Sequence, residues 1–591
     1  MDPISAAGIG LSVISLALQV FAGCVKGYQL FSDAEGMPAA YQHLRVRLRI
    51  EQTRLLNWGE KVGLIEEKLN DPSRVLQLNR NLIIDILLEV QILFRSCVAI
   101  QDKFDQLVPQ KPPGNDMAAS NKDIFNRRFP KGTNTMLSKT LGFLEKAPEV
   151  PRRLQWAVVK KDRFEGLVEK LIHYNTSIEA LLDSTAIDQL QTLQQQTYMA
   201  ILQLNSDVVE LKEISLALQI RTKEGNQGNG AMDQATRSNI GQAQDRNQAT
   251  FSRLADFKAQ QMQLEVNPSV ATLDPIPITD IALKASSDVR SEASYRGNCI
   301  WIEWKQYTSG HNTNSKWILT IEDRIKKLAI LLGSDNKPPQ FNAPQCLGYF
   351  KDSTHKRYGF LYAKPSGVPP KISPTSLLNL IHSTSANPPS VTKRIALAHA
   401  VARCLMYLHS VNWLHKGLRS NNIIFFIPPG ESPTYSDPLI AGFEYARPDF
   451  PDEETEPPPE HSDHDIYRHP AIFARTVSRS QKSHDIYSLG IVLVEIAYWK
   501  PIDEVMEMPK EDRAARSRVK KVRDLLLNGE YLDSVEGRVG EVYANAVRKC
   551  LTGGTDLGIE KSANESDVEV GARMQEIFAE DVVGKLRDVK V

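Results

Sequence analysis

The chain has 591 residues, 71 basic and 71 acidic side chains, and a hydrophobic fraction of 42%. This length predicts two to four domains, and the balanced charge gives no overall field that would indicate nucleic acid or an anionic membrane as a partner. The six cysteines include no CxxC pair, which argues against a zinc site and a disulfide framework and is typical of a reducing cytosol.

The chain opens with an uncharged stretch from Pro3 to Val25. Asp2 precedes it in place of a basic residue, so we expect no secretory signal peptide. About 20 residues are enough to cross a bilayer, but Gly10 and Gln19 weaken a membrane-spanning helix. We therefore expect a buried helix of a bundle. A constitutive span and a helix that becomes membrane-active on a signal are the alternatives.

Residues 41–220 predict a helical bundle. Asn81–Phe94 is apolar nearly all round and is expected to lie at its centre, and Phe164–Leu182 repeats the apolar pattern. Heptad-like spacing from Ile201 to Leu218 predicts a brace helix that packs back on the bundle, with self-association as the alternative. One predicted helix face carries Leu44, Leu48, Leu55, Trp58 and Val62, spaced by three, four and seven residues.

Residues 221–275 predict a linker, because the segment is rich in Asn, Gln and Gly and poor in large apolar residues. Beyond it, Cys299–Tyr307 and Tyr358–Lys364 predict strands, and Ser390–Ser410 and Asp485–Trp499 predict helices. The predicted fold class is multidomain: an all-α bundle over 1–220, then an α+β domain over 276–591. The latter has a small lobe at about 276–370 and a large lobe at about 371–591.

Four segments of this second domain resemble protein kinase motifs in order and spacing. They are HKGLRSNN (His415–Asn422), IAGFEYAR (Ile440–Arg447), YRHPA (Tyr467–Ala471) and DIYSLGIVLVE (Asp485–Glu495). The resemblance implies a two-lobed kinase-like fold. It also implies structural roles for His415, Asp485 and Gly490.

The departures from the kinase pattern affect the chemistry. Gly417 and Gly442 replace the two aspartates that would take the substrate proton and hold magnesium. The loss of a general base alone costs roughly 10²–10⁴ in rate. Lys305 and Asn422 remain as weak candidate ligands for a nucleotide. The resemblance therefore implies a pseudokinase with no catalytic residue, no metal, and no cofactor beyond weak, metal-independent ATP binding.

The first half resembles a HeLo domain, a helical membrane-targeting domain of fungal cell-death and incompatibility proteins of the prion-inhibition and propagation type. The resemblance is carried by GIGLSVISLALQVFAGCVKGYQLF and by YQHLRVRLRIEQTRLLNWGE, which contains the structural Trp58. It implies a first helix that is buried at rest and inserts into membrane on activation. The implied membrane-active residues are Ile9, Gly10, Leu11, Val13, Ile14, Leu16, Leu18 and Phe21.

Together these resemblances predict a cell-death or heterokaryon-incompatibility effector. Its HeLo bundle would permeabilise membrane under the control of an inactive kinase-like domain. We expect a cytoplasmic protein that relocates to membrane, binds lipids, self-associates and senses an upstream protein, with no nucleic-acid partner. A divergent active Ser/Thr kinase and a non-enzymatic signalling scaffold are the alternatives.

Overall fold

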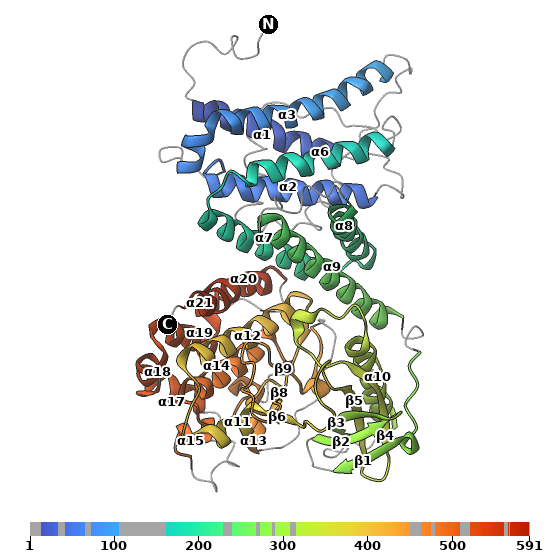
Figure 1. Cartoon of the computed structure of the whole chain (residues 1–591), viewed down its shortest axis with the longest axis vertical. Coiled ribbons are helices and arrows are strands. Elements are labelled where there is room, and N and C mark those ends of the chain that lie inside the picture. The colour runs from blue at the N-terminus through green and yellow to red at the C-terminus, as the bar shows by residue number, and fades with distance from the viewer. Residues whose placement is uncertain are drawn as a thin grey trace. The chain divides into compact units, whose positions relative to one another are not determined.

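The computed structural model divides into two compact units, Met1–Ala255 and Asp256–Val591, which we describe separately (Figure 1). The described residues are 13–32, 42–65, 73–105, 161–227, 239–267, 272–285, 290–307, 315–449, 462–473, 479–508, 521–560, 565 and 568–589.

The first unit is helical, as predicted. Its helices are α1 (Val13–Ser32), α2 (Gln42–Val62), α3 (Arg74–Asp105), α6 (Lys161–Glu179), α7 (Ser184–Leu204), α8 (Val208–Gln227) and the first part of α9 (Asn239–Val266). Helices α1, α2, α3 and α6 share one apolar core, to which α7 adds Leu190. The five apolar residues predicted to line one face of α2 are all buried.

The centre of the bundle differs from the prediction. Within Asn81–Phe94 of α3, the side chains of Leu82 and Ile92 are 48% and 53% exposed, so this segment is not central. The more polar α2 takes that place, since Arg47, Glu51 and Arg54 are all buried with its apolar residues. A polar helix is buried here because its charged side chains bind partners on neighbouring helices.

The predicted brace helix is split between two helices. Ile201 belongs to α7 and Leu211 to α8, and residues 205–207 separate them. Asp207 N–H donates to the Asn205 side chain at 2.8 Å, so a turn interrupts the heptad-like pattern. The polar side chain satisfies the backbone locally, which is why the apolar spacing alone did not reveal the break.

The predicted linker differs from the structure, since α9 occupies residues 239–266 and α8 extends to Gln227. Phe251, Leu254, Phe257 and Leu264 are buried along α9, spaced by three and seven residues. In the first unit, Phe251 packs on Tyr198 with 4.9 Å between ring centroids. The surrounding Asn and Gln residues lower the average hydrophobicity of the segment, so its composition alone did not reveal this apolar stripe. The boundary between the two units lies at residues 255–256, inside the segment 221–275.

The second unit combines sheets and helices, as predicted. A five-stranded antiparallel sheet has the order β1 (Ile281–Ala285), β2 (Arg290–Tyr295), β3 (Asn298–Gln306), β5 (Arg357–Ala363), β4 (Cys346–Asp352). Helix α10 (Ser315–Gly333) packs on β4. The predicted strands coincide with β3 and β5, because aromatic and β-branched side chains fill a pleated surface that is buried.

Helices dominate the rest of the second unit, where the two predicted helices are α12 (Val391–Ser410) and α14 (Lys482–Tyr498). Two small sheets join β7 (Trp413–Leu414) to β10 (Arg447–Pro448), and β6 (Pro374–Ser376) to β8 (Ile423–Phe426) and β9 (Leu439–Ile440). The other helices are α11 (Leu377–Thr384), α13 (Ser462–Asp465), α15 (Ile502–Val505), α17 (Val522–Asn528), α18 (Tyr531–Val539), α19 (Glu541–Thr552), α20 (Val568–Phe578) and α21 (Lys585–Asp588).

Candidate functional site

Helix α1 carries most of the residues predicted to be membrane-active. Val13, Ile14, Leu16, Leu18 and Phe21 belong to it. Leu18 is half-buried and Phe21 is buried in the core, whereas the predicted positions 9–11 lie outside the described residues. No helix in the described part of the chain is long and apolar enough to cross a membrane.

Aromatic packing and close backbone contact hold α1 in the bundle. Phe21 lies 6.5 Å from the predicted structural residue Trp58 between ring centroids, and Trp58 is fully buried. A Cβ atom on Gly59 would collide with the Phe21 ring, so the glycine lets α1 approach α2 closely. Burial also raises the pKa of the Cys24 thiol, which keeps this side chain neutral within the core.

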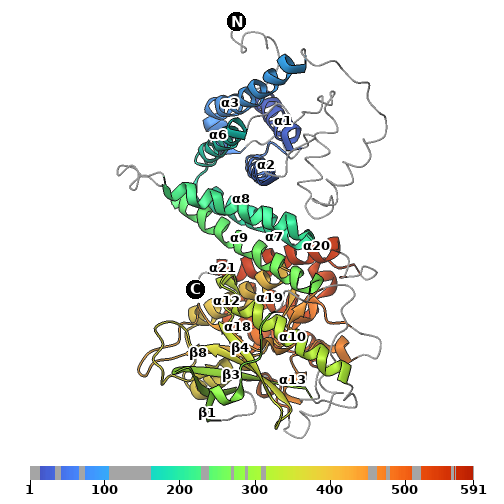
Figure 2. The same cartoon turned by 90° about the vertical axis from the view of Figure 1, so that its right-hand side faces the viewer.

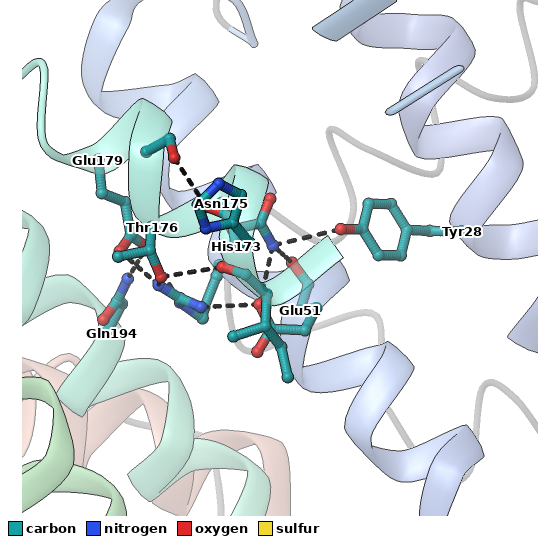
Figure 3. Close-up of polar contacts among 10 residues, drawn as sticks. Tyr28, Glu51, His173, Asn175, Thr176, Glu179 and Gln194 are labelled. Atoms are coloured by element: carbon teal, nitrogen blue, oxygen red, sulfur yellow. Dashed lines mark hydrogen bonds and ion pairs between the residues drawn. The ribbon is translucent and has the colours of Figure 1, made fainter. Parts of the chain in front are cut away.

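A group of buried polar residues lies beside α1, and we call Glu51, Arg54, Asn175 and Glu179 the polar centre. Figure 3 labels Glu51, Asn175 and Glu179 among the residues whose polar contacts it draws. Arg54 binds Glu179 through two nitrogens at 2.5 and 3.1 Å, and binds Glu51 at 2.7 Å. The Asn175 amide donates to the Glu51 carboxylate at 2.9 Å and to the hydroxyl of Tyr28 at 3.2 Å. The polar centre thus connects α1, α2 and α6.

The buried charges of the polar centre stabilise one another. Burial opposes the charged guanidinium, but Glu179 and Glu51 outweigh it and raise the pKa of Arg54 above its usual value. Gln194 of α7 donates a further hydrogen bond to Glu179 at 3.0 Å. Two carboxylates share one guanidinium here, so the loss of Arg54 would leave like charges buried side by side. Sequence patterning treated α2 as an apolar stripe and missed this group.

In the second unit, Asp485 organises the segment that contains His415. Its carboxylate accepts hydrogen bonds from the backbone amides of His415 and Lys416 at 2.7 and 2.8 Å. The ring of His409 lies 3.3 Å from the same carboxylate. His415 is itself buried and packs on Phe443, with 4.6 Å between ring centroids. These contacts fix the backbone of the loop and place the predicted structural residues inside the fold.

Close packing surrounds the predicted glycine positions. Gly442 has φ +85°, and a Cβ atom there would collide with the side chain of Asn422. A Cβ atom on Gly417 would lie 2.7 Å from the carbonyl oxygen of Gly442. On α14, a Cβ atom on Gly490 would lie 3.0 Å from Cβ of Cys550, so this predicted structural glycine permits close helix packing. The two loop segments therefore touch at Gly417 and Gly442.

Asn422, a predicted nucleotide ligand, is engaged within the protein. Its amide donates to the Gly417 carbonyl at 2.7 Å and accepts from Arg290 at 2.8 Å. Arg290 also pairs with Glu303 at 2.8 Å, and the Glu303 carboxylate accepts the Gly442 amide at 3.0 Å. Burial raises the pKa of Glu303, while the charge of Arg290 opposes that shift. Sequence reasoning did not identify Arg290, although it faces Glu303 across the β2–β3 hairpin.

The other predicted nucleotide ligand, Lys305, lies under an aromatic ring. Its ammonium is 3.4 Å from the centroid of the Tyr445 ring, a cation–π contact. The cavity beside it measures about 20 Å³ and is lined by the basic residues Lys305, Arg324, Lys416 and Arg447 together with Glu444. Ligand sites for small molecules have volumes of about 300–1,000 Å³. The structure does not place Lys305 and Asn422 around an open cavity of that size.

The contribution of Glu495 to the stability of the second unit is expected to fall as pH rises from about 4.5 to 7, whereas His469 and His484, whose pKa values burial lowers, contribute in the opposite direction. Burial raises the pKa of Glu495 to about 7, although Tyr467 and the Ile502 amide donate hydrogen bonds to it. A folded-state pKa above the unfolded value means that the stabilisation is complete below about 4.3 and is lost as pH rises toward 7. Glu495→Gln should remove this dependence, on the order of 2–3 kcal/mol at about 1.4 kcal/mol per pKa unit.

Urea unfolding followed at several pH values measures this effect. The exposed Glu504 provides the control, since Glu504→Gln should keep the slope of the wild-type protein. A difference in stability between the wild-type protein and Glu495→Gln that does not change between pH 4.5 and 7 would contradict the assignment.

Two family models match the chain, one in each half. A family model described as a domain of unknown function (DUF7580) matches residues 349–590, from β4 to the end of the second unit. The match excludes β1, β2 and β3, which carry Arg290 and Lys305. No curated protein matches the chain. The HeLo family model, described as prion-inhibition and propagation, matches residues 8–214, and the HeLo domain is associated with cell-death and incompatibility effectors.

Proposed function

We propose that the protein is a cell-death or incompatibility effector whose helical bundle permeabilises membrane. The match of residues 8–214 to the HeLo model carries this proposal. It is supported by α1, where Lys26 is the one charged residue in 20, and where Phe21 and Val25 are among the apolar side chains packed in the core. A helix of this composition can move from the protein core into lipid, because few polar side chains add to the free energy of insertion.

The second unit acts in this proposal as a kinase-like domain without catalytic activity. It senses an upstream protein and restrains the bundle, and the protein moves from the cytoplasm to membrane and self-associates on release. The close contact between the Gly417 and Gly442 segments supports this role, because it leaves no space for either catalytic aspartate. Arg290 binds Asn422, which is one of the two candidate nucleotide ligands.

Dye release from liposomes tests the first part of the proposal. The full-length protein, oligomerised by a fused dimerising tag, should release dye from liposomes with anionic lipids, while the untagged protein should not. A protein that releases no dye in either form would refute the membrane role and favour a scaffold.

Phosphotransfer is expected to be absent. The full-length protein with ATP and magnesium should label neither itself nor a generic substrate above background, because Gly417 and Gly442 stand at the positions of the two aspartates that take the proton and bind the metal in the kinase motifs. Gly417→Asp/Gly442→Asp should not gain activity and should be less stable, because both side chains meet the backbone or side chain opposite. Labelling by the wild-type protein that Lys305→Ala abolishes would refute the pseudokinase proposal.

A further inference from the structure

The guanidinium of Arg290 is surrounded by oxygen atoms from two parts of the second unit that are far apart in the sequence. Its Nη1 donates to the main-chain carbonyl of Asn421 at 2.7 Å, and its Nη2 donates to the side-chain oxygen of Asn422 at 2.8 Å. From the neighbouring strand, one carboxylate oxygen of Glu303 lies 2.8 Å from Nη2 and 2.9 Å from Nε. Two neutral oxygens and one carboxylate oxygen thus converge on a single, largely buried cation.

The arrangement of these oxygens suits a planar, forked cation. Each oxygen lies at hydrogen-bond distance from the guanidinium, and the three are shared among Nε, Nη1 and Nη2. A guanidinium presents its N–H donors in one fixed plane, whereas an ammonium is a point charge. A magnesium ion would require its ligands at about 2.0–2.1 Å. The ligand that fits this group of oxygens is therefore a guanidinium.

The same cation connects the segments that contain Gly417 and Gly442. Asn422 donates from its amide to the Gly417 carbonyl at 2.7 Å, and the second carboxylate oxygen of Glu303 accepts from the Gly442 amide at 3.0 Å. A Cβ atom at position 442 would collide with the Asn422 amide. The glycine therefore lets Asn422 lie where it reaches Arg290, so the two residues belong to one arrangement.

Another buried ion pair of the same sheet shows what differs at Arg290. Arg357 binds Asp352 at 3.0 Å, and the two residues face each other on the β4–β5 hairpin. That pair joins neighbouring strands. Arg290 also bonds to its cross-strand partner, but its two other bonds go to residues 421–422, which precede β8 and lie outside the five-stranded sheet. Its guanidinium is therefore a joint between this sheet and the rest of the second unit.

We propose that these oxygens form a guanidinium site whose resident ligand is Arg290, and that this cation takes the place of a metal-bound nucleotide in joining the sheet to the segments of Gly417 and Gly442. The state of the second unit then does not depend on nucleotide, so its signal arrives by another route. The comparison with a nucleotide rests on the proposed function, whereas the guanidinium site does not.

Removing the resident cation and supplying it again from solution tests the site. In the full-length protein, Arg290→Ala should make the amides of β3 exchange with solvent roughly tenfold faster or more, because the Glu303 carboxylate loses its buried partner. Methylguanidinium at millimolar concentration should slow this exchange again and should do so saturably. Methylammonium and magnesium at the same concentration should not, because neither has a planar fork of donors.

Matched variants separate the site from general effects of charge and of the added salt. Arg296→Ala removes an exposed arginine from the turn of the same hairpin and should leave the exchange of β3 unchanged. Arg290→Ala/Glu303→Gln lacks the carboxylate, so methylguanidinium should no longer slow its exchange. Recovery of Arg290→Ala with methylammonium or magnesium as complete as with methylguanidinium, or no recovery with any of them, would overturn the guanidinium site.

Arg290→Lys covers the case in which Arg290→Ala does not fold. It keeps a positive charge beside Glu303, but one ammonium cannot bind all three oxygens in the same geometry. Its amides over residues 421–426 should therefore exchange faster than those of the wild-type protein. Exchange equal to that of the wild-type protein would overturn the site.

ATP tests the second part of the inference on the wild-type protein. With or without magnesium, it should not slow the exchange of β3 or of residues 421–426, because Arg290 already binds Asn422 and Glu303. Phosphotransfer by the wild-type protein would refute the proposed function. Slower exchange with ATP in a protein that transfers no phosphate would overturn the replacement of the nucleotide alone.

Discussion

Arg54→Met is expected to lower the free energy of unfolding of the helical bundle by about 3–5 kcal/mol, because removing one partner of a buried ion pair has a cost in this range. The guanidinium is 1% exposed and contacts both Glu51 and Glu179. Without it, two carboxylates face each other away from water. Hydrogen exchange of the amides of α2 and α6 in the full-length protein measures the effect and separates it from the second unit.

A compensated variant distinguishes the buried charge from lost packing. Glu51→Gln/Arg54→Met/Glu179→Gln removes all three charges, while the new amide oxygens still accept hydrogen bonds from Asn175 and Gln194. We expect this variant to recover most of the lost stability, because no unpartnered ion remains. Lys61→Met, at the accessible end of the same helix, should change stability by less than about 0.5 kcal/mol. Equal stability of the single and triple variants would contradict the charge explanation.

The spacing of apolar residues predicts the helices of the first unit. It does not predict which of these helices is buried most deeply. The sequence predicts the stripe that contains Leu48 and Trp58, and both side chains are buried. It also predicts a central place for Asn81–Phe94, because that segment has the most continuous apolar character. The structure buries Arg54 and exposes Ile92 instead. Pairing between Arg54 and Glu179 joins residues 125 positions apart, which no local pattern encodes.

The candidate site in the second unit was predicted in part. The sequence alone predicts that Gly417 and Gly442 stand where the resembled kinase motifs have aspartates. The sequence does not show that a side chain at position 442 would have no space, because this depends on Asn422 lying against Gly442. The role of Arg290 lay within reach of sequence reasoning, since a hairpin turning at Arg296 and Gly297 pairs residue 290 with 303. That register places an arginine opposite the buried Glu303, so the ion pair follows from strand geometry.

Gln19→Lys is expected to release dye about 100-fold less than Gln19→Leu while the folded bundle stays intact. Gln19 is exposed on α1, so a charge there remains in water as long as the helix is packed in the protein. In a membrane-inserted helix the same residue lies near the middle of the apolar stretch. A lysine at that depth costs about 2.5–3.5 kcal/mol, which corresponds to roughly two powers of ten in the inserted population at about 1.4 kcal/mol per tenfold.

Two further variants separate insertion from a general effect of charge. Thr185→Lys adds the same charge at an exposed position of α7 and should release dye like the wild-type protein. Gln19→Leu removes a polar group from α1 and should release dye at least as well. Circular dichroism checks that each variant keeps its helical content. If the folded Gln19→Lys variant releases dye as fast as Thr185→Lys, this part of α1 does not enter the apolar layer, and permeabilisation must use another surface of the bundle.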